Sequence, residues 1–169
     1  MNASDILHYG HTFVTRNIDD LPLEHWETPN VCGWWSTKLV IGHLASFEHM
    51  LVEVLRSFQS AASGGPTPYL DMMNNQGGQL FNDFQIEARK NRPAADLLAE
   101  YTAAAEESHR LVGLLDPALL RRPGTLPWYG LEYALDDYIV YQYYGHKREH
   151  TAQINVFKDT LKAAGMLPA

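Results

Sequence analysis

Apolar residues recur every three or four positions along four segments of the chain, which predicts amphipathic helices. The first predicted helix covers about residues 4–19, and the second begins at Ser36, a good N-cap, and ends near residue 60. A third follows Pro93, a residue that suits the first turn of a helix. The fourth covers about residues 135–162 and ends before Gly165, a typical helix C-terminus. The pattern predicts an all-α fold of four main helices.

The segments between these helices are rich in glycine, proline and asparagine. Residues 61–75 contain Gly64, Gly65, Pro66 and Pro68, which predicts a loop, and a short helix is expected from about residue 79 to 90. No internal repeat and no linker divides the sequence. A length of 169 residues also suits one hydrophobic core. Residues 1–169 are therefore expected to form a single domain.

Each predicted helix has an inward stripe of apolar residues. In the first helix the candidates for core contacts are Ile6, Tyr9, Phe13 and Val14. The stripe of the second comprises Val40, His43, Phe47, Met50, Val54 and Phe58, with Leu44, Leu51 and Leu55 beside it. The stripe of the fourth comprises Leu135, Ile139, Gln142, His146, His150, Phe157 and Leu161. Three histidines are thus expected to face the interior.

His146 and His150 are four residues apart, which places them about 40° apart around a helix and roughly 6 Å apart along it. Two imidazoles in this arrangement can point at one ion. A buried imidazole needs hydrogen-bond partners, and a metal bound by His43, His146 and His150 would satisfy all three. Neutral imidazole is a frequent ligand of Zn, Ni, Fe and Cu. The alternative from spacing alone is that the three are ordinary core histidines that form hydrogen bonds.

Two glutamates lie near these histidines in the sequence. Glu48 and Glu149 could hydrogen-bond the imidazole N–H groups, or they could be solvated charges on helix surfaces. One Glu-x-x-His pair, Glu106 with His109, is too little for a di-iron bundle, which needs two such pairs and two further glutamates.

The overall charge excludes one class of partner. A formal net charge of −7 argues against nucleic-acid binding, because phosphates require clustered lysines and arginines. No apolar run approaches the roughly 20 residues that cross a bilayer, and the first 20 residues lack a signal-peptide pattern. The single cysteine, Cys32, fits a reducing compartment. A cytoplasmic protein with no membrane partner is expected.

Two motifs give the chain a family resemblance. Residues 33–44, GWWSTKLVIGHL, resemble the start of the second helix in DinB-like proteins, and residues 146–154, HKREHTAQI, resemble their second signature, His-x-x-x-His followed by Gln-Ile. The order and spacing of the motifs and the chain length also agree. The resemblance implies an up-down-down-up four-helix bundle that binds Zn or Ni through three histidines, commonly as a homodimer.

This superfamily includes mycothiol-dependent maleylpyruvate isomerases and bacillithiol transferases, so the resemblance admits a low-molecular-weight thiol as cofactor. Three protein ligands leave a metal position open for substrate or water. We therefore expect a metal-dependent enzyme that acts on a small electrophile by thiol transfer or hydrolysis, with Gln142 orienting the substrate or water. The alternative is a non-catalytic protein that binds metal or a small ligand in stress tolerance or self-protection.

Overall fold

A computed structural model describes residues 2–59 and 65–168 of the chain. Within these ranges the chain consists of helices and loops, and its only β-type pairing is an isolated bridge between Cys32 and Trp35. The predicted all-α class is confirmed.

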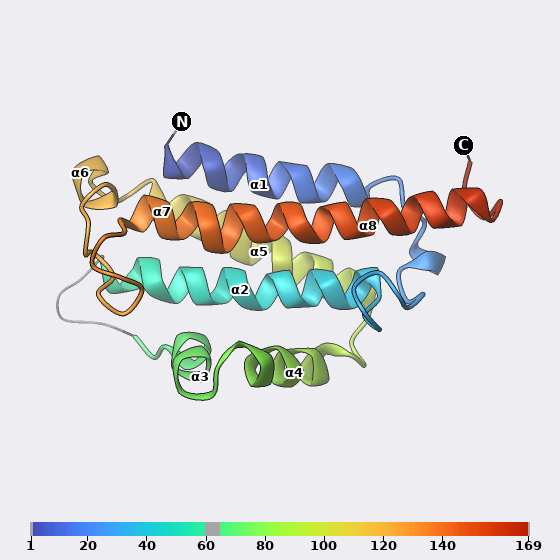
Figure 1. Cartoon of the computed structure of the whole chain (residues 1–169), viewed down its shortest axis with the longest axis horizontal. Coiled ribbons are helices and arrows are strands. Elements are labelled where there is room, and N and C mark those ends of the chain that lie inside the picture. The colour runs from blue at the N-terminus through green and yellow to red at the C-terminus, as the bar shows by residue number, and fades with distance from the viewer. Residues whose placement is uncertain (1, 60–64, 169) are drawn as a thin grey trace.

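Four long helices lie side by side along the long axis of the molecule (Figure 1). They are α1 (Ala3–Ile18), α2 (Thr37–Ser57), α5 (Ala94–Val112) and α8 (His146–Ala163). The shorter elements are η1 (Leu23–His25), α3 (Pro68–Gln76), α4 (Gly78–Arg89), α6 (Pro117–Leu120), α7 (Leu135–Ile139) and η2 (Val140–Gly145). Helices α2 and α5 share the most extensive contact, α8 packs mainly on α1, and α3 and α4 cover α2 from outside.

The predicted helix ends agree closely with the structure. The Ser36 hydroxyl accepts a hydrogen bond from the Leu39 N–H at 3.4 Å and caps α2. Pro93 immediately precedes α5 rather than lying in its first turn. Gly165 has a φ of +72°, and its N–H donates to the Lys162 carbonyl, which closes the last turn of α8.

Part of the predicted loop is a helix. Residues 60–64 lie outside the described residues, but Pro68–Gln76 form α3. Pro68 occupies the first turn, where a missing N–H costs nothing. The next two N–H groups, of Tyr69 and Leu70, donate to the Glu53 carboxylate on α2 at 3.2 and 2.9 Å. A glutamate 16 residues away therefore stabilises the start of this helix.

The inward face of α1 differs from the predicted one. Tyr9 and Phe13 are 54% and 40% exposed, so their assignment to the core was wrong. Smaller residues face inward instead: Ala3, Leu7, Gly10, Val14 and Ile18. The reason is that α1 lies close to α8. A Cβ atom on Gly10 would lie 3.1 Å from Cδ of Lys147.

The fourth predicted helix is interrupted. Residues 140–145 form the π-helix η2 between α7 and α8, where wider turns replace α-helical ones. Apolar residues on both sides of η2 are buried, including Leu135, Ile139, Ile154 and Leu161. The apolar pattern in the sequence predicts which side of α7 and of α8 faces the core. It does not predict the change from α-helical to π-helical turns between them. Within the described ranges, no helix has both the length and the apolar character needed to cross a membrane.

The apolar stripe of α2 gives the first prediction. The Leu51 side chain is fully buried, so Leu51→Ala removes apolar contacts and leaves a cavity. The free energy of unfolding should fall by about 2–5 kcal/mol in urea denaturation. The control is Leu80→Ala on α4, where the side chain is 57% exposed and the change should stay within about 0.5 kcal/mol. Equal effects of the two substitutions would contradict the described core.

Candidate metal centre

Three imidazole rings from two helices meet at one point. Nε2 of His146 lies 2.9 Å from Nε2 of His43 and 2.9 Å from Nε2 of His150. One ring nitrogen from each residue lies within 4.8 Å of those of the other two. Across residues 2–59 and 65–168, this is the one group of three or more His, Cys, Asp or Glu side chains that lie close enough to share an ion. The structure thus brings together the three histidines that the sequence singled out.

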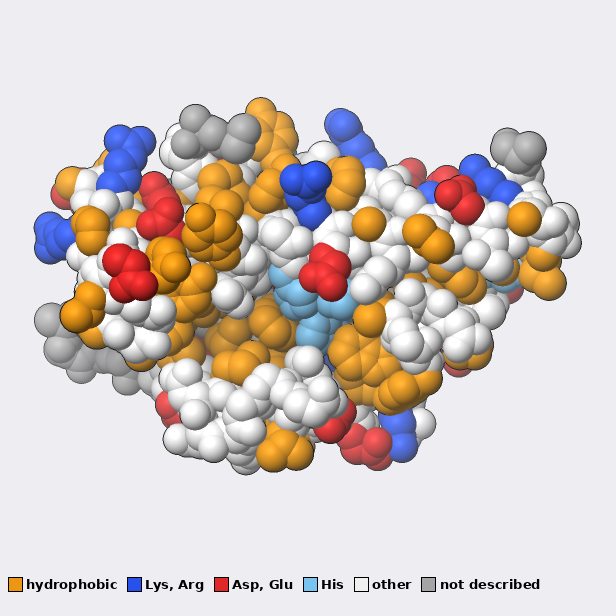
Figure 2. Space-filling model, in the orientation of Figure 1, with side chains coloured by type: hydrophobic (Ala, Val, Ile, Leu, Met, Phe, Trp, Pro, Cys, Tyr) orange, Lys and Arg blue, Asp and Glu red, His pale blue; other side chains and the backbone are white. Residues whose placement is uncertain are grey.

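The local fold explains this convergence. His146 and His150 lie one turn apart on α8, and His43 lies in the first half of α2. Two aromatic rings line the group: the Trp35 ring centre is 4.9 Å from that of His43, and the Phe47 ring centre is 4.4 Å from that of His146. Figure 2 shows histidine side chains at the bottom of a hollow with hydrophobic side chains around it. The group is therefore mostly shielded from water but reachable from one face.

The hydrogen bond of the outer ring nitrogen of His150 favours a cation at the centre. Nδ1 of His150 lies 2.8 Å from the Gln153 side-chain oxygen, which only accepts, so Nδ1 carries the proton and Nε2 turns its lone pair toward the centre. Nδ1 of His43 is buried without a partner among the described residues. Each neutral ring has only one N–H, so the three rings cannot saturate one another. The donor set, three imidazoles and no carboxylate, fits Zn or another borderline divalent ion.

Burial keeps these rings neutral. It lowers the pKa of His43 to about 2, with further lowering by the nearby His146 and His150. It lowers the pKa of His146 to about 3, and the adjacent His150 adds to this effect. The pKa of His150 is also lowered by burial. Neutral imidazole is the form that ligates metals, so the site is ready to bind near pH 7.

Gln142, the predicted catalytic residue, lies in η2 rather than in an α-helix. Its side-chain amide donates to the Tyr129 hydroxyl at 3.3 Å. The side chain is half-buried, and its role stays a prediction.

The structure corrects the expectation for Glu48 and agrees with one of the two alternatives for Glu149. Glu48 neither contacts an imidazole nor is solvated: it is 1% exposed and pairs with the buried Lys147 at 2.5 Å. Glu149 is exposed, as a surface charge should be. Gln153, the partner of His150, was not among the predicted site residues, although its position three residues later on the same helix face signals that contact.

The comparisons with known proteins identify the family. The family model for the mycothiol maleylpyruvate isomerase N-terminal domain matches residues 7–132, about three quarters of the chain. The chain belongs to this family, a DinB-like superfamily domain, which confirms the family resemblance. The match includes His43 and ends before η2 and α8. Neither the curated proteins nor the solved structures gave a match.

The buried histidines predict how stability depends on pH in metal-free protein. Their pKa values in the fold lie below the roughly 6.5 of the unfolded chain, so the unfolded chain binds more protons between these values. Stability should be full above about pH 6.5 and fall as the pH drops toward 3. The loss is up to about 1.4 kcal/mol per pH unit for each histidine.

Thermal melts in a chelator from pH 7.5 to 4.5 measure this dependence. His43→Gln should flatten the profile, because one buried titrating group is removed. His8→Gln, which changes an exposed histidine on α1, should not, because an exposed ring is not removed from water by folding. An unchanged profile in His43→Gln would show that this ring is not buried in its neutral form.

Proposed function

We propose that this member of the mycothiol maleylpyruvate isomerase N-terminal domain family is a metal-dependent enzyme that acts on a small electrophile, by thiol transfer or hydrolysis. Its divalent ion, Zn or Ni, is bound by His43, His146 and His150. The observation that carries the proposal is the convergence of three neutral ring nitrogens at the bottom of a hollow. Three ligands from the protein leave room for a further ligand, the arrangement typical of catalytic rather than structural sites.

The ion, when bound, lowers the pKa of a thiol or water that binds beside the histidines, so that a nucleophile is present near neutral pH. The chain's own residues have supporting roles. Gln153 fixes the tautomer and orientation of His150 through its 2.8 Å contact with Nδ1. Trp35 and Phe47 exclude water from two sides of the group. We assign to Gln142, held by Tyr129, the orientation of the substrate or nucleophile.

The family name supports a low-molecular-weight thiol as the second cofactor, because it refers to mycothiol. Aromatic walls and buried ligands suit a small substrate with an apolar part. We further propose that residues 1–169 act as one domain in a cytoplasmic homodimer. The four long helices would form the up-down-down-up bundle of DinB-like proteins, which the directions of the chain in Figure 1 support.

Metal content tests the ligand set. Untagged wild-type protein should hold close to one divalent ion per chain by elemental analysis. His43→Ala and His146→Ala should each lose most of it, since each removes one of three ligands. The control is His49→Ala on α2, which removes an imidazole that contacts Glu100 at 3.1 Å instead. Full occupancy in either ligand variant would show that the ligands are wrongly assigned.

Turnover tests the enzymatic role. Metal-loaded protein, incubated with a panel of low-molecular-weight thiols and small electrophiles, should form a thioether or a hydrolysis product. Chelation should abolish the rate, while the helical circular dichroism should persist, because the apolar core of α2 does not depend on the ion. Metal binding without turnover would favour the non-catalytic alternative. Loss of helicity after chelation would show that the ion is needed for folding and has a structural role.

A further inference from the structure

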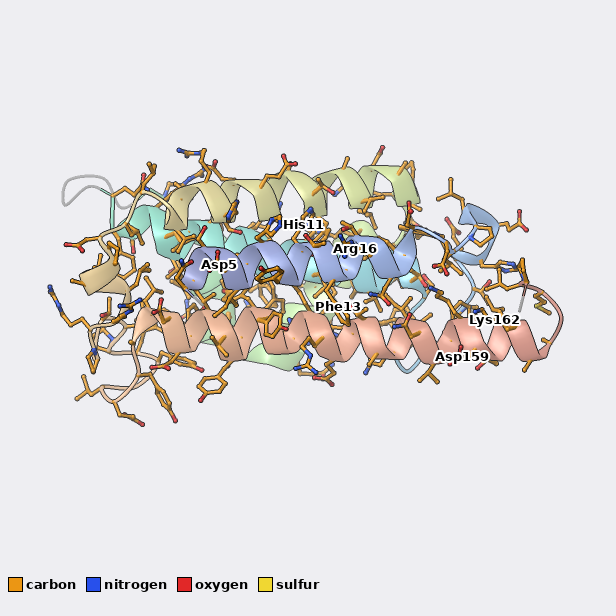
Figure 3. All side chains as sticks on the ribbon, turned by 90° about the horizontal axis from the view of Figure 1, so that it is seen from above. Asp5, His11, Phe13, Arg16, Asp159 and Lys162 are labelled. Carbon is orange, nitrogen blue, oxygen red and sulfur yellow. The ribbon has the colours of Figure 1, made fainter. Side chains whose placement is uncertain are left out.

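A cluster of polar side chains lies in the interior between the long helices, apart from the three histidines. It comprises His11 of α1, Glu48 of α2, Tyr101 and Ser108 of α5, and Lys147 of α8. Four of these side chains are at most 2% exposed, and His11 is half-buried. Figure 3 shows His11 on the side of α1 toward α5. Each long helix thus contributes to this interior polar cluster.

An ion pair lies at the centre of the cluster. Nζ of Lys147 lies 2.5 Å from one carboxylate oxygen of Glu48, and the Ser108 hydroxyl donates to the other at 2.7 Å. Nζ of Lys147 is also 6.0 Å from the centre of the Tyr101 ring. The Tyr101 hydroxyl and Nδ1 of His11 have no partner among the described residues. Hydrogen bonding within the cluster is therefore incomplete.

Stability alone does not explain such a pair. Removing two charges from water costs about as much as their attraction returns, and apolar residues of similar size often do equally well. The position of the pair suggests a different role. Lys147 directly follows His146, and Glu48 lies five residues after His43 on α2. The pair joins the two helices that carry the histidines, and these helices otherwise touch at few points.

Two features link the position of α8 to this pair. The π-helix η2 separates α7 from α8, so His146 does not follow the regular α-helical register of the buried side chains of α7. The aliphatic part of Lys147 also lies in a narrow passage. A Cβ on Gly10 would lie 3.1 Å from Cδ of Lys147 and 3.3 Å from the Tyr144 ring. From this passage the Lys147 ammonium reaches Glu48 at 2.5 Å in the observed rotation and height of α8.

We propose that Glu48 and Lys147 are positioning residues, whose buried ion pair fixes α8 against α2 so that Nε2 of His146 and His150 meets Nε2 of His43. This inference rests on the proposed metal site. It assigns a role to side chains that do not touch the ion.

The test separates stability from metal affinity. Lys147→Met leaves Glu48 buried and unpaired, so both the melting temperature and the Zn²⁺ affinity should fall. The double variant Glu48→Leu with Lys147→Met removes both charges, and its metal-free melting temperature should recover most of the loss. Its Zn²⁺ affinity, from competition with a chromophoric chelator, should stay about tenfold or more below wild type. The visible absorption of bound Co²⁺ should change as well.

The matched control is Lys158→Met, on the same helix. Lys158 is 8% exposed and pairs with Asp20, two turns beyond His150. Its loss should lower the melting temperature and leave Zn²⁺ affinity and the Co²⁺ spectrum unchanged. If the double variant does not fold, Glu48→Gln replaces it, since the amide keeps the shape and removes the charge. Here too a weaker Zn²⁺ affinity in folded protein is expected.

Wild-type affinity in a folded double variant, or in folded Glu48→Gln when that variant replaces it, would overturn the positioning role and leave the metal site intact. A wild-type protein that binds neither Zn²⁺ nor Co²⁺ would overturn the proposed metal site and this inference with it. The two failures are therefore distinguishable.

Discussion

The three buried imidazoles impose the constraint on which the rest of this structure depends. Their nitrogens converge, yet each neutral ring has only one proton to donate, so hydrogen bonding within the protein leaves lone pairs facing one another. Protonation does not relieve this, because burial lowers the pKa of each ring. A bound cation relieves it directly. The aromatic walls, the Gln153 contact and the packing of α8 on α1 all hold the rings where that cation would bind.

Two adjacent residues of α8 face different parts of the molecule. His146 turns toward α2 and the hollow, whereas Lys147, about 100° further around the helix, turns into the interior. A rotation of the helix would move both side chains together. A charge-paired lysine tolerates such movement poorly, since separation from Glu48 leaves two unpaired charges away from water. The interior charge and the histidine ligands are therefore linked, because Lys147 and His146 are adjacent residues of one helix.

Local patterns in the sequence predict the parts of the site that depend on one helix at a time. The spacing of His146 and His150 and the place of His43 among apolar residues predict that all three face inward, and Ser36 and Gly165 mark helix ends. Contacts between helices leave no such periodic signal. The Glu48–Lys147 pair spans 99 positions, and periodicity along either helix gives no sign of it. Apolar periodicity also misplaced Tyr9 and Phe13, because the close approach of α1 to α8 favours small residues at the contact.

The family match and the geometry together divide the site into two parts. The matched region supplies His43 and the aromatic residues Trp35 and Phe47, while α8, beyond the match, supplies the other two ligands. A π-helix lies at the junction, and it carries Gln142. Wide turns of this kind often occur at functional sites because they shift side chains without ending a helix. In this chain Gln142 of η2 lies near the Tyr129 hydroxyl, and α8 begins directly after η2 with His146 and Lys147. The fold therefore sets where an ion can bind, and η2 joins the part of the site inside the family match to the part beyond it.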